Sequence, residues 1–167
     1  MSYSLGSRSL KNLEGVHPQL VDVVKRAIKM TEQDFTVLDG VRTVEEQREN
    51  VRRGVSKTMN SYHLPQGDGF GHAVDLVPWV NGKPRWEWEC IYPICMAVGE
   101  AAREAGLPIR WGGFWGMISP KPDRSVITVT AIEQSVHDYV RERTSRGRSA
   151  FIDGPHYEYR PDLLRLR

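Results

Sequence analysis

The chain lacks any run of uninterrupted apolar residues near the roughly 20 that a bilayer-spanning helix requires. We therefore expect no stable membrane insertion. The first eight residues also lack the apolar core of a secretion signal. This absence predicts that the protein is made in the cytoplasm and stays there unless another factor releases it.

Cysteine is scarce, because Cys90 and Cys95 are the only two in the chain. On a helix, five positions correspond to a rotation of about 140°, so these two side chains would not share a face. We interpret them as buried thiols. A disulfide or a metal-binding pair is the alternative.

The chain also lacks a strong excess of one charge, since its formal net charge is +2. So mild a charge does not indicate nucleic acid as a partner. The length of 167 residues and the hydrophobic content of 40% are typical of one domain with a sizeable core. We therefore expect a single domain over residues 1–167.

Hydrophobic periodicity predicts a helix over about 18–30, where apolar residues recur on one stripe, namely Leu20, Val23, Val24, Ala27 and Ile28. Residues 35–38 have the composition of a short strand. Thr43 and Glu46 have the spacing of a capping box, which predicts a helix from there to about residue 53. Arg42 would then lie at a strand-to-helix junction, where a side chain can project into a site.

Residues 62–70 are rich in Gly and Pro, which predicts a loop, and a buried strand is expected over 73–77. The remaining patterns predict a helix over 88–105 and strands over 109–111 and 156–159. The last strand would place both of its tyrosines on the face opposite His156 and Glu158. Helices and strands mix without a regular βαβ repeat. We therefore expect an α+β fold with a small, mainly antiparallel sheet flanked by helices.

Four polar residues in two distant segments have the chemistry of a catalytic zinc site. A hydrolytic zinc centre needs three protein ligands, a position left open for water and a nearby carboxylate that takes the proton of that water. His63, Asp75 and His156 are candidate ligands, and Asp153 is the candidate base. An ionised acid within an apolar strand is costly unless it is paired or bound to metal. For Asp75, a helix N-terminus or a salt bridge remains an alternative partner.

The alternation of side chains between the two faces of a strand indicates which histidines can lie beside Asp75. His72 and Asp75 are three positions apart, so on a straight strand their side chains point to opposite faces. We therefore predict that His72 is not a ligand beside Asp75, whereas His63 can fold back from its loop. His17, next to a proline, is interpreted as a helix start, and His137 as a solvated helix residue.

Taken together, these segments resemble the signature of the hedgehog/D-alanyl-D-alanine peptidase superfamily of zinc peptidases. The resemblance rests on residues 61–63, 71–76 and 153–158, and it extends over most of 7–115 and over 151–159. Within the superfamily, the chain is most similar to the phage L-alanyl-D-glutamate endopeptidases. These are endolysins related to the vancomycin-resistance D,D-carboxypeptidases.

The resemblance implies a zinc ion (Zn2+) held by His63, Asp75 and His156, with Asp153 as the catalytic acid and base. Arg42 matches the arginine of the family that stabilises the oxyanion of the tetrahedral intermediate; a surface arginine is its alternative. Substrate contacts are expected from three further residues, Ser61, Gln47 and Trp111.

Two roles near the site stay open. Glu158 is expected to hold the second ring nitrogen of His156. Trp111 and Trp115 lie near paired glycines and are expected to line the cleft, with a place in the core as the alternative.

The resemblance also implies a substrate and a setting. The expected substrate is the stem peptide of bacterial peptidoglycan, cut between L-alanine and D-glutamate during host lysis by a phage. A monomer made in the host cytoplasm would then need a holin to reach the periplasm and the cell wall. Two alternatives remain: a D,D-carboxypeptidase or dipeptidase acting on D-alanine ends, and a non-catalytic wall-binding module.

The chain departs from the family pattern at two places. His63 and Asp75 are twelve positions apart instead of the usual seven, as if about five residues were inserted after His63. This spacing leaves open that His72 or Asp68 enters the site. An insertion at about 116–150 carries a predicted helix with a basic end. That helix is interpreted as a solvated helix, with a lid or a surface for anionic polymer as the alternative.

Overall fold

A computed structural model describes residues 2–119 and 127–164, so residues 120–126 of the expected insertion lie outside the described part. One antiparallel sheet contains the strands β1 (Phe35–Asp39), β2 (Ala73–Val80), β3 (Lys83–Pro84), β4 (Ile109–Trp111), β5 (Gly116–Ser119) and β6 (His156–Tyr159). Its order is β1-β2-β6-β4-β5, and β3 pairs with β2. The expected α+β fold with an antiparallel sheet is therefore confirmed.

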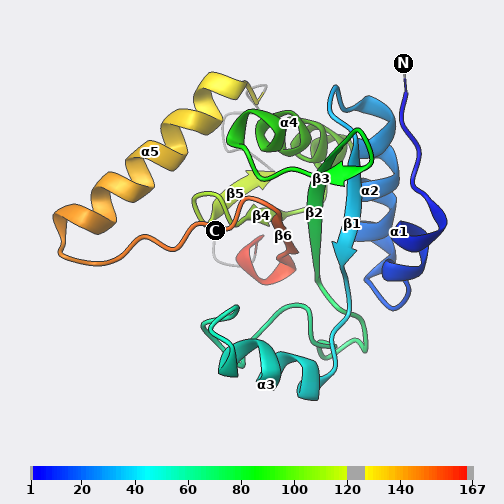
Figure 1. Ribbon diagram of the computed structural model, residues 1–167, viewed down its shortest axis with the longest axis horizontal. Coiled ribbons are helices and arrows are strands. Elements are labelled where there is room, and N and C mark those ends of the chain that lie inside the picture. Colours follow the sequence, from blue (N-terminus) through cyan, green and yellow to red (C-terminus); the bar gives the residue numbers. More distant parts are fainter. Residues whose placement is uncertain (1, 120–126, 165–167) are drawn as a thin grey trace.

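The helices surround this sheet (Figure 1). They are α1 (Ser7–Asn12), α2 (Pro18–Met30), α3 (Val44–Arg52), α4 (Trp88–Ala105), α5 (Val129–Ser145) and the short 3-10 helix η1 (Pro161–Leu164). The two long helices α2 and α4 pack on each other, and α4 packs on β2, β4 and β5. In the described part of the chain, no helix combines the length and the apolar character needed to cross a membrane.

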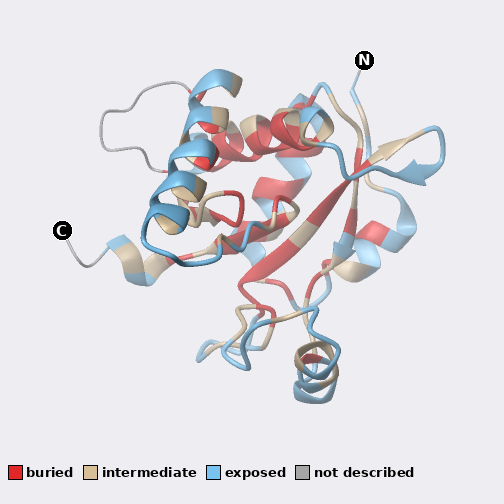
Figure 2. Ribbon diagram, turned by 60° about the vertical axis from the view of Figure 1, so that its left-hand side comes forward, coloured by how far each residue is buried: buried red, intermediate tan, exposed pale blue. Residues whose placement is uncertain are grey.

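The core lies between these helices and one face of the sheet. All five residues of the expected stripe on α2 are buried, and they join β-strand residues such as Val37, Leu76 and Tyr157 in one apolar cluster. Figure 2 shows that buried residues concentrate in the central strands and the adjoining helix faces, whereas α3 and α5 are mainly exposed. The opposite face of the sheet is therefore left for the candidate site.

Most of the expected elements are confirmed. Helix α2 spans the expected range, and α4 matches its range and ends at Gly106, which has the left-handed conformation that glycine adopts easily. The capping box of α3 forms as expected, because Thr43 accepts from the Glu46 amide and Glu46 accepts from the Thr43 amide. The expectation of a single domain over residues 1–167 stays a prediction.

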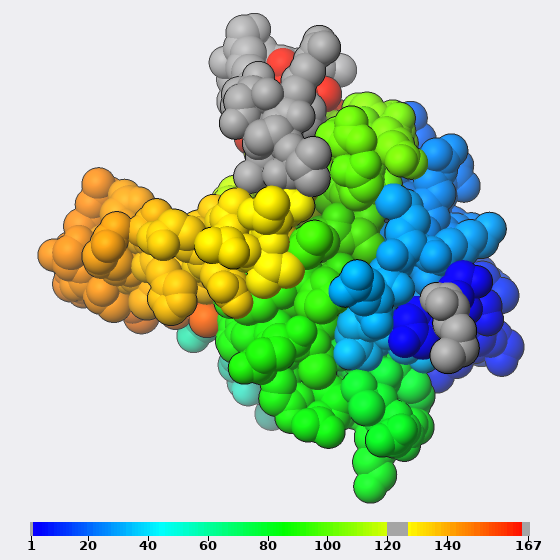
Figure 3. All heavy atoms as spheres, turned by 90° about the horizontal axis from the view of Figure 1, so that it is seen from above, coloured from blue at the N-terminus to red at the C-terminus, as the bar shows by residue number. Residues whose placement is uncertain are grey.

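The helix expected in the insertion is confirmed as α5. Ile132 and Val136 are its buried residues, and they face the α4 side of the molecule. The rest of α5 extends away from the body (Figure 3). Its exposed ion pairs, such as Arg141–Asp138 and Arg146–Glu142, are local to the helix.

The two cysteines lie in α4. Cys95 is buried and Cys90 is half-buried, and neither forms a disulfide in the described part of the chain. The expectation of buried thiols is therefore confirmed for Cys95 and only partly for Cys90.

Candidate active site and metal centre

The centre of the site is a cross-strand pair on β2 and β6. Asp75 on β2 lies directly opposite His156 on β6 in the antiparallel register. Residues opposed in this way project to the same face of a sheet, so their side chains meet. His63 reaches the pair from the loop that follows α3, and its side chain is 1% exposed. The sheet register therefore brings together residues that are far apart in the sequence.

The three side chains form a nearly equilateral triangle of ligand atoms. Asp75 Oδ1 lies 3.0 Å from His156 Nδ1 and 3.3 Å from His63 Nε2, and the two ring nitrogens are 3.2 Å apart. Ligands bound to a tetrahedral zinc ion at 2.0–2.1 Å stand roughly 3.3 Å from one another. The donor set and its spacing therefore fit a zinc ion.

Hydrogen bonds behind the triangle set the tautomer of each histidine. His63 Nδ1 donates to the Gly40 carbonyl at 2.6 Å, which leaves Nε2 free to act as a ligand. His156 Nε2 donates to Glu158 Oε1 at 2.9 Å, which leaves Nδ1 facing Asp75. Glu158 thus has the position expected from the sequence. Once His156 has lost its Nδ1 proton, both rings present a lone pair to the same point.

Glu158 is itself held by two arginines. Arg110 Nη2 lies 2.6 Å and Arg160 Nη1 lies 3.4 Å from Glu158 Oε2. Burial favours the neutral acid, but His156 and Arg110 outweigh it and lower the pKa of Glu158. Glu158 therefore stays ionised and fixes the orientation of the His156 ring.

The charges of the triangle reinforce one another. Burial alone would raise the pKa of Asp75, but the neighbouring His63 and His156 hold it well below its usual range. Burial would lower the pKa of His156, but its bonds to Asp75 and Glu158 raise it to about 10. In the metal-free protein, His156 therefore holds a proton on Nδ1 at neutral pH, which a metal ion bound there would displace.

Arg42 anchors the second oxygen of Asp75. Its Nη2 donates to Asp75 Oδ2 at 3.0 Å, its Nε pairs with Asp39, and its Nη1 donates to Gln47 Oε1 at 3.2 Å. Arg42 also lines the cleft in front of the triangle. The structure therefore gives Arg42 a positioning contact that the sequence did not indicate.

Asp153 lines the same cleft and is only half-buried. Burial and the nearby Asp75 carboxylate raise its pKa, and the positive charges of the site only partly oppose this shift. A carboxylate with raised proton affinity is a better base.

The backbone of Asp153 is held by Gly112, since the Asp153 amide donates to the Gly112 carbonyl at 3.0 Å. A side chain at position 112 would place its Cβ 2.3 Å from the Asp153 carbonyl, so only glycine permits this approach.

The triangle opens into a cleft of about 700 Å³. Six of its lining residues are Arg42, Ser61, Trp86, Trp115, Phe151 and Asp153. Ser61 also accepts the His63 amide at 3.2 Å, so it orients the loop that carries this histidine. Trp115 lies over His156 with a ring separation of 5.5 Å, which agrees with its expected place at the cleft.

The burial of Trp111 and Gln47 contradicts the expectation that these two residues contact the substrate. Trp111 and Gln47 are both 0% exposed, so neither has surface to offer a substrate. Trp111 lies in the core and donates its indole N–H to the Gly154 carbonyl at 2.6 Å. Gln47 donates to Ser56 and to the Thr58 carbonyl while it accepts from Arg42. Both residues support the walls of the site from behind.

The structure also answers whether His72 or Asp68, the two alternative ligands near the inserted loop, enters the site. His72 and Asp68 do not join the triangle; they lie together with His17 in a separate group. His72 follows the parity of the strand and points to the face of the sheet opposite Asp75. His17 begins α2, as expected, and its ring accepts from the Gln19 amide.

Several residues of the site were missed by sequence reasoning, namely Asp39, Gly40, Arg110 and Arg160. Asp39 pairs with Asp75 across β1 and β2, and Arg110 pairs with Glu158 across β4 and β6. For Arg110 and Glu158, a base and an acid at facing strand positions would have indicated the contact, whereas Asp39 and Asp75 are two acids that Arg42 bridges. The strand register needed to see this was not available from the sequence.

Comparisons with known proteins agree with this geometry. The family model for phage L-alanyl-D-glutamate peptidase matches residues 1–133. A curated L-alanyl-D-glutamate peptidase of Escherichia phage T5 is 34% identical over 119 residues, which cover 69% of this chain and 83% of the relative. A second one, of Listeria phage A118, is 29% identical over 119 residues, which cover 70% of this chain and 40% of the relative.

A solved structure is similar over nearly the whole chain. It is that of the Serratia marcescens L-Ala D-Glu endopeptidase ChiX, with a TM-score of 0.64, 34% identity and coverage of 94% of this chain and 90% of that chain. The fold, the cleft and these similarities define the protein as a peptidase. The chain belongs to the phage L-alanyl-D-glutamate peptidase family.

Proposed function

We propose that the protein is a zinc-dependent phage endolysin that hydrolyses the L-alanyl-D-glutamate bond of the peptidoglycan stem peptide. The observation that carries the proposal is the triangle of His63, Asp75 and His156, whose ligand atoms lie 3.0–3.3 Å apart. The names of the relatives support the choice of bond.

The residues of the cleft have separate tasks in this proposal. A zinc ion held by the triangle would polarise the scissile carbonyl and make a water molecule more acidic. Asp153 accepts the proton of the attacking water and then delivers a proton to the leaving amine. Arg42 keeps Asp75 in place and supplies positive charge on the side where the oxyanion develops.

Glu158 is expected to control metal affinity through His156. We expect Glu158→Gln to weaken zinc binding by about 10- to 100-fold, because the amide holds the ring less firmly and leaves two arginines without their carboxylate. Competition with a zinc-binding dye measures the affinity. The control is Glu142→Gln on the exposed part of α5, which should bind zinc normally. Unchanged affinity in folded Glu158→Gln would contradict the role of Glu158.

The second candidate activity is trimming of D-alanine ends by a D,D-carboxypeptidase or dipeptidase. Bond choice depends on the shape of the cleft rather than on the metal chemistry. Mass spectrometry of digested muropeptides separates the two activities. We expect released peptides that begin with D-glutamate. Release of D-alanine alone would replace the endopeptidase proposal with the carboxypeptidase one.

The proposed route to the substrate follows from the proposed activity. An endolysin of this kind is made in the host cytoplasm as a monomer and reaches the periplasmic cell wall through a holin. Peptidoglycan is its macromolecular partner, and the small net charge of +2 gives no indication of a nucleic acid partner.

A further inference from the structure

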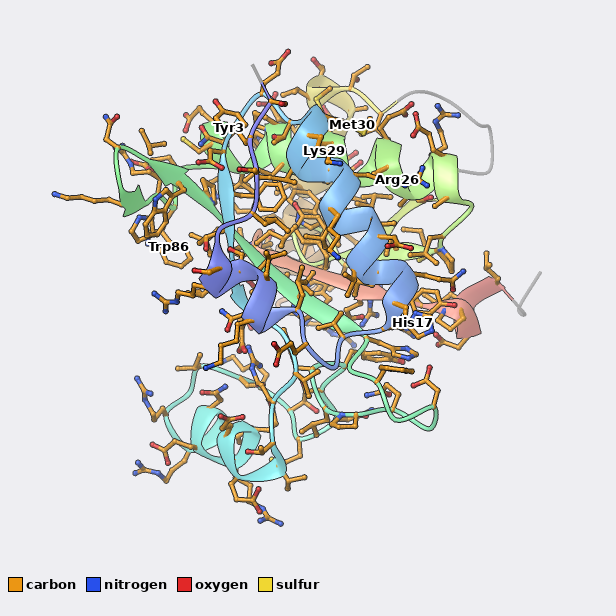
Figure 4. The ribbon with its side chains drawn as sticks, turned by 90° about the vertical axis from the view of Figure 1, so that its right-hand side faces the viewer. Tyr3, His17, Arg26, Lys29, Met30 and Trp86 are labelled. Atoms are coloured by element: carbon orange, nitrogen blue, oxygen red, sulfur yellow. The ribbon has the colours of Figure 1, made fainter. Side chains whose placement is uncertain are left out.

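A second group of potential metal ligands lies on the opposite face of the sheet from the cleft. His17 is the N-cap residue of α2, Asp68 belongs to the loop that follows His63, and His72 directly precedes β2. Their ligand atoms all lie within 4.8 Å of one another. Figure 4 shows His17 at the end of α2, beside the loop region. This group is independent of the triangle in the cleft.

The group is enclosed by aromatic rings. The His72 side chain is 9% exposed and that of His17 is 18% exposed, whereas Asp68 reaches the surface at 41%. The Tyr159 ring packs against His17 at 4.6 Å and against His72 at 5.1 Å, and the Phe70 ring meets His17 edge-on at 5.7 Å. The two imidazoles are thus held in place, and solvent reaches them from the Asp68 side.

The spacing of the group is close to that of a metal site. Asp68 Oδ2 lies 2.8 Å from His72 Nε2 and 3.7 Å from His17 Nε2. A tetrahedral zinc ion places its ligand atoms roughly 3.3 Å apart, so these two distances have to change by only about half an ångström, and the two histidine nitrogens lie within 4.8 Å of each other.

Metal binding at this group would break one hydrogen bond of His17. His17 Nδ1 accepts the Gln19 amide at 3.3 Å, so a neutral His17 carries its proton on Nε2 in the metal-free protein. Metal binding at Nε2 requires this proton on Nδ1 and therefore gives up a long, exposed hydrogen bond. In the triangle, metal binding keeps the hydrogen bonds of His63 to Gly40 and of His156 to Glu158. Affinity at the second group should therefore be lower.

We propose that His17, Asp68 and His72 form a second site, which binds a divalent transition metal such as zinc. The metal would join the start of α2 to the inserted loop between His63 and Asp75. That loop carries one ligand of the cleft at its beginning, so the second site fixes the path of the chain behind the active centre.

Titration of the metal-free full-length protein with Co2+ and Zn2+ tests the site. We expect two metal ions per chain, the second at least tenfold weaker, and a rise in the melting temperature across the second step. Asp68→Asn and His17→Asn should each bind only one ion; asparagine at position 17 preserves the N-cap of α2. His137→Gln on α5 is the control for surface histidines and should still bind two.

The outcomes separate this proposal from the proposed function. One ion in the wild type that is lost in Asp75→Asn would overturn the second site and leave the zinc centre of the cleft intact. Two ions retained in both Asp68→Asn and His17→Asn would place the second ion elsewhere and also refute the site. Two ions in the wild type and one in Asp75→Asn, Asp68→Asn and His17→Asn would support both sites.

Discussion

Asp153→Asn is expected to reduce the rate of peptide release from purified cell walls by about 10²- to 10⁴-fold, the usual contribution of general acid–base catalysis. Asparagine preserves the size of the side chain but cannot accept the proton of the attacking water. The backbone bond from Asp153 to Gly112 does not involve the side chain, so the fold should persist. Zinc content should also be unchanged, because Asp153 is not part of the ligand triangle.

Asp138→Asn provides the matched control for this variant. Asp138 lies on the exposed part of α5, and its side-chain contacts among the described residues, with Gln134 and Arg141, are within its own helix. Its substitution should leave lysis unaltered. An Asp153→Asn enzyme that lyses walls at the normal rate would refute the assignment of Asp153 as acid and base. A wild type that fails to release peptides from walls and from isolated muropeptides would instead support the non-catalytic binding module.

Removal of the metal by a strong chelator is expected to abolish peptidase activity, and added Zn2+ should restore it. The three ligands would then lack the ion that activates water, and Asp153 alone cannot replace it. The melting temperature should fall as well, because a ligand that binds only the folded state stabilises it. Protons compete with the metal for the histidines and for Asp75, so chelation should proceed faster at acidic pH than at neutral pH.

Asp75→Asn distinguishes loss of the metal from other effects of the chelator. This variant keeps the size of the side chain but removes the charge that both histidines face, so zinc should not restore its activity. Chelator-resistant wall lysis by the wild type would contradict the zinc mechanism. A glycosidase with paired carboxylates would then be the better interpretation.

The regular elements with strong local signals could be predicted from the sequence. The range of α2 followed from its apolar stripe, and that of α4 from its alanines and the terminal Gly106. The missed elements, α1, β3, β5 and η1, are two to six residues long. So short a segment contains too few residues for a periodic pattern, and its conformation depends on the neighbours with which it pairs.

The candidate ligands were recognisable because each carries its own constraint. Asp75 stood out as an acid within an apolar strand, and parity separated it from His72. The partners that hold these ligands were not recognisable. Glu158 is held by Arg110 from the neighbouring strand β4 and by Arg160 just after its own strand β6. The pairing of Arg42 with Asp39 and Asp75 depends on how β1 faces β2.

Burial produced the clearest corrections. Trp111 and Gln47 are part of motifs that the resemblance connects with the site, yet both side chains are completely buried. A motif records that a residue lies near a site but not whether it faces the substrate or supports the wall behind it. This distinction depends on which surfaces the rest of the chain covers.

The sequence by itself determined the α+β class, the main helices and the chemical character of the candidate metal ligands. These features follow from local periodicity and from the chemistry of single residues, which neighbours along the chain largely specify. Only the tertiary structure decided the 3.0–3.3 Å triangle, the contacts of Arg42 and Glu158, and the separate group around His72. Each of these depends on strand register and on loop placement. Both are set by packing between residues that are distant in the chain.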